Sequence, residues 1–385
     1  MAITQNYPVN TLAVSEGDVA FGFSMLPYLG KGNISFSPLS IRTALSMIYE
    51  GARKASAKEI SDTAFIPKVI QTRLKGYNDL MSLLNSKDDN HTLSSANSLW
   101  INRNFNVNPS YQTFLREIYK IDFTNDDFIS GAGLLRTDKT EGKIPQLFPP
   151  GSITPNTVIA LANTLYFKGI WENKFDIKLT QKYDYTLEDG KKVQVDMMTK
   201  GEIEGQVKLP KLLYGSFDGF QIIMLPYKGH ELANIIMLAP RTSDISQLEE
   251  AIQKVPRTFA DLLEKLEWRS FSRLEIPKHE VHGSYSLNSP LQKMGIKSIF
   301  DPKTSDLKGI GDGELFIDSL HHQTYFKTDE EGSEGSAVTG FSARRATSCE
   351  KPKTVEFVVD RPFLEMIIHK PTKSLLFLNR IADPR

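Results

Sequence analysis

The sequence predicts one large α+β domain, and three observations lead to that prediction. Helical and strand-like segments are interspersed without the regular alternation of a βαβ protein. No Gly/Ser-rich linker and no repeat period divides the 385 residues. A hydrophobic content of 40% is enough for a large buried core.

The first third of the chain is mainly helical. A Ser-Pro start signal opens the run 37–65, in which Ile41, Leu45 and Ile48 share one face. A strand is predicted at 93–102. Further helices are predicted at 69–85, 109–119, 245–255 and 258–268.

The rest of the chain is rich in strands. Short apolar runs bounded by Gly, Pro or charged residues predict strands at 157–167, 220–227 and 233–240, and Gly229 marks a hairpin between the last two. The run 355–369 is expected to pair with 374–381. Because both are apolar on both faces, we expect them at the centre of a sheet.

Composition excludes several classes of protein. Lys plus Arg and Asp plus Glu each number 46, so the formal net charge is zero, which argues against a nucleic-acid binder. A single cysteine, Cys349, excludes an internal disulfide and a Cys-rich zinc site. The sequence shows neither a signal-peptide pattern nor a run of about 18 apolar residues, so we expect a soluble chain without a membrane partner.

Two N-x-Ser/Thr sequons are present. Asn33 lies in an apolar, strand-like run and is expected to be buried and unused, whereas Asn90 in "SKDDNHT" is expected in a surface loop.

The common catalytic motifs are missing, including the P-loop, the dinucleotide-binding glycine pattern and the G-x-S-x-G elbow. His279 and His282 in "HEVH" resemble half a metal site, but on a strand they would point to opposite faces, so we interpret them as a surface polar pair. The sequence predicts no enzyme, metal or cofactor. A dispersed Ser–His–Asp set stays open as an alternative.

The most unusual segment is "TDEEGSEGSAVTGFSARRATSCEKPKT", residues 328–354. So long a polar loop is typical of a linker or of a functional loop, and the strands after it look like core rather than a second domain. In an extended strand its small residues would share one face, and an ionic residue there would be costly to bury. The small face holds Ser333, Gly335, Ala337 and Thr339, and the other face holds Glu334, Ser336 and Val338. The pattern predicts a loop that can become a strand.

Several motifs in order resemble the serpin family over essentially the whole chain. They are "NISFSPLSIRTALSMIYEGARKASAKEI" (33–60), "ANSLWIN" (96–102), "TEGKIPQLF" (140–148), "NTLYFKGIWENKF" (163–175), "LPYKG" (225–229), "EEGSEGSAVTG" (330–340) and "DRPFLEMII" (360–368). The resemblance implies one serpin domain over 1–385. It also implies helices packed around three mainly antiparallel sheets, with an exposed reactive-centre loop at about 330–353.

The resemblance further implies a serine protease inhibitor that acts as a suicide substrate. The protease attacks the loop and forms an acyl-enzyme, and the cleaved loop then inserts into the main sheet and distorts the protease. The implied hinge consists of Glu330, Glu331, Gly332, Ser333, Glu334, Gly335, Ser336, Ala337, Val338 and Thr339. Gly335 stands where alanine is commoner in the family, and Val338 is bulkier than usual. A non-inhibitory serpin that is cleaved as a plain substrate is the alternative.

Two bonds are candidates for cleavage. The family's spacing of fourteen residues from the hinge glycine points to Ala346, and hence to the Ala346–Thr347 bond and an elastase-like enzyme. Arg344 and Arg345 instead suit a protease pocket with a carboxylate at its base. We therefore expect cleavage at Arg345–Ala346 by a trypsin-like protease, with Ala346–Thr347 as the alternative.

The resemblance also implies a region where the main sheet opens. Ser37, Ser40, Asn163 and His322 match a cluster beneath the central strands, and Trp171 matches an aromatic near the point of insertion. The expected state is a monomer that can form loop–sheet polymers. Residues 69–87 contain no dense row of Lys and Arg side chains, so we expect no site there for a sulfated polysaccharide. The family favours an extracellular location, and the leaderless start leaves a cytoplasmic one open.

Overall fold

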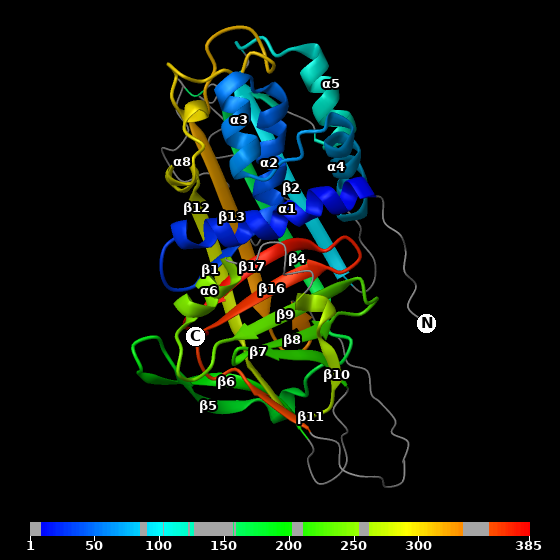
Figure 1. The fold of residues 1–385 in the computed structure, drawn as a ribbon, viewed down its shortest axis with the longest axis vertical. Coiled ribbons are helices and arrows are strands. Elements are labelled where there is room, and N and C mark those ends of the chain that lie inside the picture. Colours follow the sequence, from blue (N-terminus) through cyan, green and yellow to red (C-terminus); the bar gives the residue numbers. More distant parts are fainter. Residues whose placement is uncertain are drawn as a thin grey trace.

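The structure is a computed structural model that describes residues 9–84, 91–102, 104–121, 124–126, 157, 159–201, 211–253, 262–333 and 354–385. It has the predicted α+β architecture, with α2 to α5 gathered at one end of the molecule (Figure 1). The α-helices with assigned bounds are α1 (Val9–Met25), α2 (Pro38–Gly51), α3 (Lys54–Thr63), α4 (Ile70–Leu84), α5 (Pro109–Ile118), α6 (Ile245–Gln253) and α8 (Asn288–Met294).

The described strands form three sheets, as predicted. The seven-stranded sheet has the order β1 (Ile34–Phe36), β17 (Ser374–Ile381), β16 (Phe363–His369), β9 (Leu232–Leu238), β8 (Phe220–Pro226), β7 (Leu212–Phe217), β10 (Glu267–Arg269). The four-stranded sheet has the order β15 (Val355–Val358), β11 (Phe271–Pro277), β6 (Lys192–Gly201), β5 (Gln181–Thr186). The third, called the long sheet below, has the order β12 (His279–Ser286), β13 (Ser319–Thr328), β4 (Ile159–Ile170), β2 (His91–Asn102), β3 (Thr124–Asp126), and β14 (Gly332–Ser333) also pairs with β4.

The long sheet connects the two ends of the molecule. In Figure 1 its strands β12, β13 and β4 run from the helical end toward the end that carries β5, β6 and β11. Most pairs in the three sheets are antiparallel, but β13 pairs with β4 in parallel. Strands β13 and β4, at the centre of the long sheet, are therefore joined by parallel pairing, which is slightly less stable per residue than antiparallel pairing.

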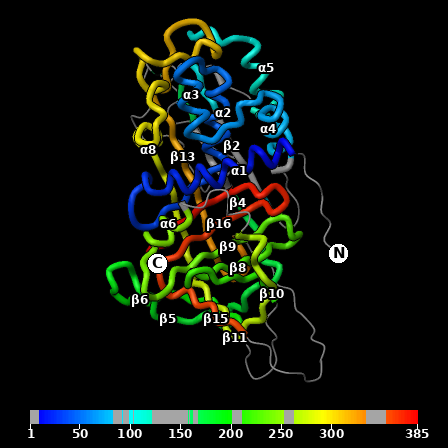
Figure 2. Tube along the Cα trace, viewed as in Figure 1, coloured from blue at the N-terminus to red at the C-terminus, as the bar shows by residue number. Residues whose placement is uncertain are grey.

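The two ends of the chain share the core. Helix α1, in blue, lies against the C-terminal strands, in red (Figure 2), and it contacts β17. Every residue of β16 and β17 is buried, and both strands lie inside the seven-stranded sheet. This confirms the prediction of central strands for residues 363–369 and 374–381.

Helix α2 begins where the Ser-Pro signal predicts. The Ser37 hydroxyl accepts a hydrogen bond from the Ser40 N–H at 3.2 Å, and Pro38 is the first helical residue. The predicted single helix over 37–65 is wrong, because the chain breaks at Ala52 and Arg53. Ala52 is extended, with ψ of 153°, and the Arg53 N–H donates to the Asp306 carbonyl at 2.8 Å instead of continuing the helix.

Two predictions about the second half need correction. The helix over 258–268 does not reach its predicted end, because Glu267–Arg269 form edge strand β10 with Trp268 opposite Leu213. The run 355–369 is two strands in two sheets, since β15 pairs with β11 and only β16 pairs with β17. The hairpin at Gly229 is confirmed, and its φ of +83° is one that glycine adopts without strain.

Asn33 is exposed, which contradicts the prediction that it is buried. Its side chain nevertheless has partners: the oxygen accepts from the N–H groups of Ala382 and Asp383 at 2.8 and 2.9 Å, and its amide donates to the Asp383 carbonyl. These bonds hold the last residues of the chain. The second sequon, at Asn90, lies outside the described residues.

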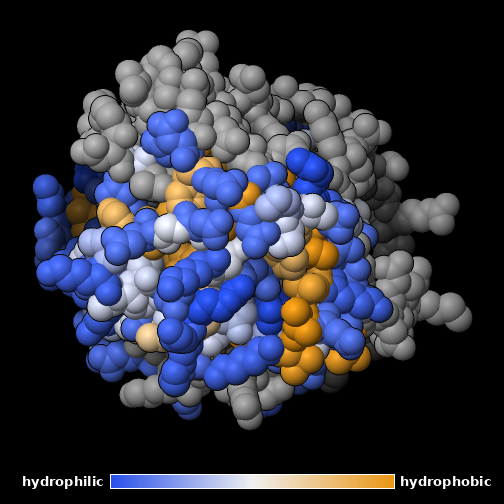
Figure 3. Space-filling model, turned by 90° about the horizontal axis from the view of Figure 1, so that it is seen from above, coloured by the Kyte–Doolittle hydropathy of each residue, from blue (hydrophilic) through white to orange (hydrophobic). Residues whose placement is uncertain are grey.

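The coloured part of the surface seen from the helical end is mainly hydrophilic, with an apolar strip and some smaller apolar patches (Figure 3). Within the described part of the chain, every helix is too short or too polar to cross a membrane.

Candidate strand-insertion site

The long sheet is forked at its centre. Strands β13 and β4 are paired from Ser319 opposite Ala160 to Tyr325 opposite Tyr166. Beyond that point β4 pairs instead with β14, which runs antiparallel to it with Gly332 opposite Ile170 and Ser333 opposite Gly169. A short strand has therefore begun to enter beside β4, next to the end of β13.

The chain reaches this position through a tight turn. Asp329 and Gly332 exchange backbone hydrogen bonds of 2.9 and 3.3 Å, and Gly332 has φ of +153°. A Cβ atom at Gly332 would lie 2.0 Å from the Gly169 carbonyl oxygen. Only glycine can hold this backbone so close to β4.

Ser333 is the second residue of β14 and a member of the predicted hinge. Its side chain is buried, and its hydroxyl lies 2.8 Å from the hydroxyl of Tyr227. The Tyr227 ring stacks on Trp171, with 4.6 Å between centroids and 7° between planes. The small face that the sequence predicts for the hinge therefore begins in contact with the core.

Trp171 lies directly against the hinge turn. Its backbone N–H donates to the Glu331 carbonyl at 3.0 Å, and its indole N–H donates to the Asp329 carbonyl at 2.9 Å. Its side chain is buried. The geometry agrees with the expected place of this aromatic at the point of insertion, and its role in sheet opening stays a prediction.

The two acidic residues of the turn have different partners. The Glu330 carboxylate accepts from Lys278 at 2.9 Å and from Thr180 at 2.6 Å, whereas Glu331 forms an ion pair with Lys174. Burial raises the pKa of Glu330, but the hydrogen bonds from Thr180 and Lys278 lower it more, so the net shift is downward. The ionised carboxylate thus anchors the turn to Lys278, which joins β11 to β12, and to Thr180, which precedes β5.

The predicted sheet-opening cluster lies nearer the helical end of the molecule than the fork does, in the part of the long sheet where β13 and β4 are still paired (Figure 1). His322 lies opposite Asn163, and its Nε2 accepts a hydrogen bond of 2.9 Å from the Ser37 N–H. Ser37, Ser40 and His322 are all buried, and the Asn163 side chain lies outside the described part. The cluster attaches the start of α2 to β13, three residues before the fork.

Lys200 of β6 is buried against Asn173 and Phe175, in the segment that the hinge turn contacts. Its ammonium donates to the Asn173 carbonyl and lies 4.1 Å from the centroid of the Phe175 ring. Burial lowers its pKa from the ordinary value to about 7. Between about pH 7 and the ordinary pKa of lysine, the folded state binds fewer protons here than the unfolded state, so stability rises with pH.

We therefore expect Lys200→Met to stabilise the fold most near pH 6 and to lose much of that advantage by about pH 9. The difference in unfolding free energy between Lys200→Met and the wild type should change by at most about 1.4 kcal/mol per pH unit. Urea unfolding at both values measures it. The control is Lys192→Met on the exposed part of the same strand, which should give the same small difference at both values; a Lys200→Met effect that does not vary with pH would contradict the assignment.

Sequence reasoning missed three members of this site: Tyr227, Lys278 and Thr180. Each lies outside the loop segment and comes to the hinge only through the fold. The remaining hinge residues and both candidate bonds lie outside the described residues: Glu334, Gly335, Ser336, Ala337, Val338, Thr339, Arg344, Arg345, Ala346 and Thr347.

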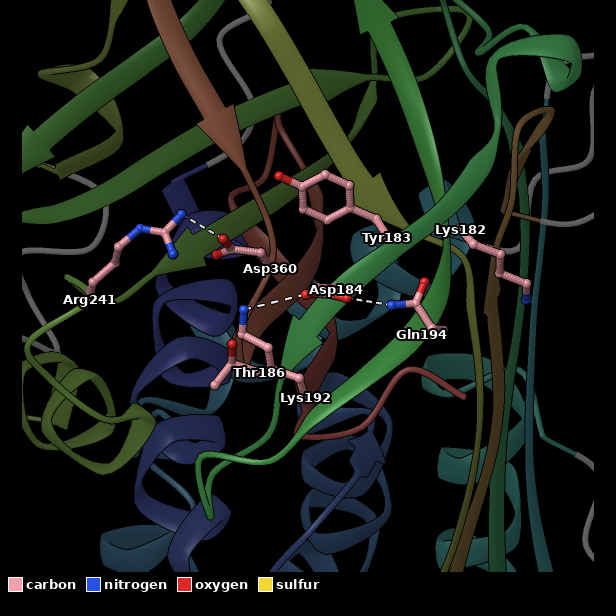
Figure 4. Close-up of a pocket in the computed structure, with 8 residues that line it drawn as sticks. All are labelled: Lys182, Tyr183, Asp184, Thr186, Lys192, Gln194, Arg241 and Asp360. Atoms are coloured by element: carbon pink, nitrogen blue, oxygen red, sulfur yellow. Dashed lines mark hydrogen bonds and ion pairs between the residues drawn. The ribbon is translucent and has the colours of Figure 1, made fainter.

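A separate polar cavity of about 540 Å³ lies on β5 and β6 (Figure 4). Each of its cations has a carboxylate partner: Lys192 pairs with Asp184, Arg241 with Asp360 at 2.5 Å, and Lys182 with Asp196 at 2.9 Å. Because each of these cations is paired with a carboxylate of the protein, we assign no ligand to this cavity.

The fold is a three-sheet α+β domain in which β4 pairs with β13 along most of its length and with the short strand β14 at its end. A family model described as Serpin (serine protease inhibitor) matches residues 19–384. The chain belongs to the serpin family, and this membership supports a serine protease inhibitor role.

Relatives agree with this assignment. Leukocyte elastase inhibitor A of Mus musculus is 32% identical, over 96% of this chain and 99% of its own length. Among solved structures, Serpin48 of the insect Tenebrio molitor has a TM-score of 0.84 at 23% identity, over 99% of this chain and 100% of its own. Human thyroxine-binding globulin has a TM-score of 0.83 at 24% identity, over 97% and 99%. At these identities the two structures show the fold alone.

Proposed function

We propose that this serpin inhibits a serine protease as a suicide substrate, by inserting its cleaved loop between β4 and β13. The observation that carries the proposal is the fork, where Gly332 and Ser333 are already paired with β4. Cleavage beyond the hinge frees the following residues to continue that pairing. The protease, still joined to the loop as an acyl-enzyme, is then carried along the long sheet.

The driving force is the completion of the sheet. Each added main-chain hydrogen bond contributes about 0.5–1.5 kcal/mol net, and burial of the small face adds to this. The inserting strand runs antiparallel to β4, as β14 already does, and would separate it from β13. Antiparallel ladders thus replace a parallel one, which favours the inserted state further.

We propose a trypsin-like target and cleavage at Arg345–Ala346, because an arginine side chain fits a specificity pocket with a carboxylate at its base. The alternative, Ala346–Thr347 and an enzyme with a small pocket, gains support from the relatives named leukocyte elastase inhibitor. Incubation with trypsin and, separately, with an elastase tests both. A covalent band on a denaturing gel shows trapping, and mass spectrometry of the released C-terminal peptide identifies the bond.

The specificity residue can be tested by substitution. Arg345→Ala should slow trapping of trypsin by about 30-fold or more, the usual effect of removing one partner of a buried charge pair. The matched control is Arg344→Ala, which removes the neighbouring cation and should change the rate far less. Equal rates for wild type and Arg345→Ala would show that Arg345 does not precede the cleaved bond.

A non-inhibitory carrier or chaperone is the alternative function. A carrier or chaperone would be clipped in the loop without forming the covalent band. The same gel therefore separates the two functions. A hydrolase would turn over small esters with no protease added.

A further inference from the structure

A buried acid–base pair joins two of the sheets beneath the hinge. His279 of β12 and Glu365 of β16 have fully buried side chains, with 2.7 Å between Nε2 and Oε2. The rings of Phe326 and Phe363 flank the imidazole at 6.1 and 5.6 Å between centroids. The interpretation of His279 as one of a surface pair is therefore wrong, and only His282 is exposed.

Hydrogen-bond geometry fixes how many protons the pair holds. The His279 Nδ1 lies 3.0 Å from the Pro277 carbonyl, which can only accept, so Nδ1 carries a proton. The Glu365 Oε1 accepts from the Asn234 amide at 2.5 Å and from the Thr328 hydroxyl at 3.1 Å. One further proton must lie between Nε2 and Oε2, since without it a lone pair would face a carboxylate oxygen in a dry site.

The same network reaches the hinge. The Asn234 amide also lies 3.4 Å from the Tyr227 hydroxyl, which is 2.8 Å from the Ser333 hydroxyl. Thr328 is the last residue of β13. The shared proton thus stabilises contacts both to the strand that must move and to the hinge residue Ser333.

These contacts oppose opening of the long sheet. Entry of a strand beside β4 requires β13 and β12 to move away from β4. In doing so they must move across the seven-stranded sheet. His279 attaches β12 to β16, and Thr328 attaches β13 to the same carboxylate. Both attachments must weaken or rearrange during insertion.

We propose that His279 and Glu365 are positioning residues for loop insertion, and that loss of their shared proton at alkaline pH speeds insertion. The inference rests on the proposed function, because it concerns the step that completes inhibition.

His279 is the titrating member of this network, whereas Lys200, with its pKa lowered to about 7, lies on β6 and donates to the Asn173 carbonyl outside the network. Burial lowers the pKa of His279, but the charge of Glu365 and the hydrogen bonds to Glu365 and Pro277 raise it more, so the net shift is upward. Burial and the Glu365 charge raise the pKa of Tyr227 far above neutral, so its hydroxyl stays protonated.

The other charged groups near the pair have partners of their own or face away from it. Lys278 pairs with Glu330, Lys327 with Asp329 and His282 with Glu280. The neighbours of Glu365 on β9 and β17 are Ile236 and Asn379, which carry no charge. Because the folded-state pKa of His279 is raised, the stabilisation is complete below the ordinary histidine value and is lost as pH rises through the raised value.

The test uses an acetylated, fluorescent peptide with the sequence of residues 333–346 and the intact protein, so that no protease activity enters the pH profile. We expect the rate of peptide incorporation to rise at least tenfold from about pH 6 to about pH 9, which corresponds to one pKa unit. Glu365→Gln replaces the shared proton by an amide N–H that donates to Nε2. Its rate should stay at the wild-type pH 6 value throughout.

Two further variants complete the design. His282→Gln removes the exposed histidine of the same strand and should keep the wild-type profile. If Glu365→Gln does not fold, His279→Phe combined with Glu365→Leu removes the pair and should also give a flat profile. A flat wild-type profile, or a variant lacking the pair that keeps the wild-type slope, would overturn the inference. Absence of both peptide incorporation and protease trapping would overturn the proposed function instead.

Discussion

Cleavage at Arg345–Ala346 should raise the melting temperature of this protein by tens of degrees. The freed segment can extend β14 along β4 and fill the fork, so the cut molecule gains a strand that the intact molecule lacks. In a chain of 385 residues a shift of about 20 °C corresponds to a net gain of roughly 16 kcal/mol, after the entropy of ordering the loop.

Differential scanning calorimetry of the intact and the cut protein measures this shift. The cut form of Ser333→Arg is the matched control, because it contains the same broken bond but cannot complete the strand. An ordinary protein loses stability when a loop is cut. Equal melting temperatures for the intact and cut wild type would mean that the sheet does not accept the loop.

Ser333→Arg should convert the inhibitor into a substrate. Ser333 is 1% exposed, and its hydroxyl lies 2.8 Å from that of Tyr227, so an arginine there would have to place a charge in the core or leave the sheet. Leaving the sheet breaks only the short pairing with β4, and the fold should survive. Insertion after cleavage would then be too slow to outrun hydrolysis of the acyl-enzyme.

The measurement is the ratio of clipped protein to covalent complex after reaction with trypsin. We expect this ratio to rise at least tenfold, the effect of about 1.4 kcal/mol on the competing barriers. Glu334→Arg is the control, because the alternation of a strand places residue 334 on the opposite, tolerant face. If Ser333→Arg traps the protease as well as Glu334→Arg does, the inward face of the hinge does not govern insertion.

Local sequence predicted much of the fold because its signals act over a few residues. The cap at Ser37 and the hairpin at Gly229 depend only on their neighbours. The wrong predictions concern segments whose structure is determined by contacts with residues distant in the sequence. Arg53 leaves its helix to bond Asp306, and Trp268 joins an edge strand opposite Leu213.

The pair His279–Glu365 shows the same limit at the candidate site. Glu365 is the only charged residue in the apolar run of β16, and a charge in a central strand signals a buried partner. That signal identifies one member, but it cannot name a histidine 86 positions away on another sheet.

The sequence by itself determined that the hinge is small on one face, that its glycine can turn sharply, and that the chain has the motifs of a serpin. Only the tertiary structure decided that the hinge begins inside the sheet, and that Trp171, Tyr227 and Lys278 are the groups that hold it there. The reason is physical: side-chain size and backbone freedom are properties of a residue, whereas burial and hydrogen bonding depend on which distant segments the fold brings together.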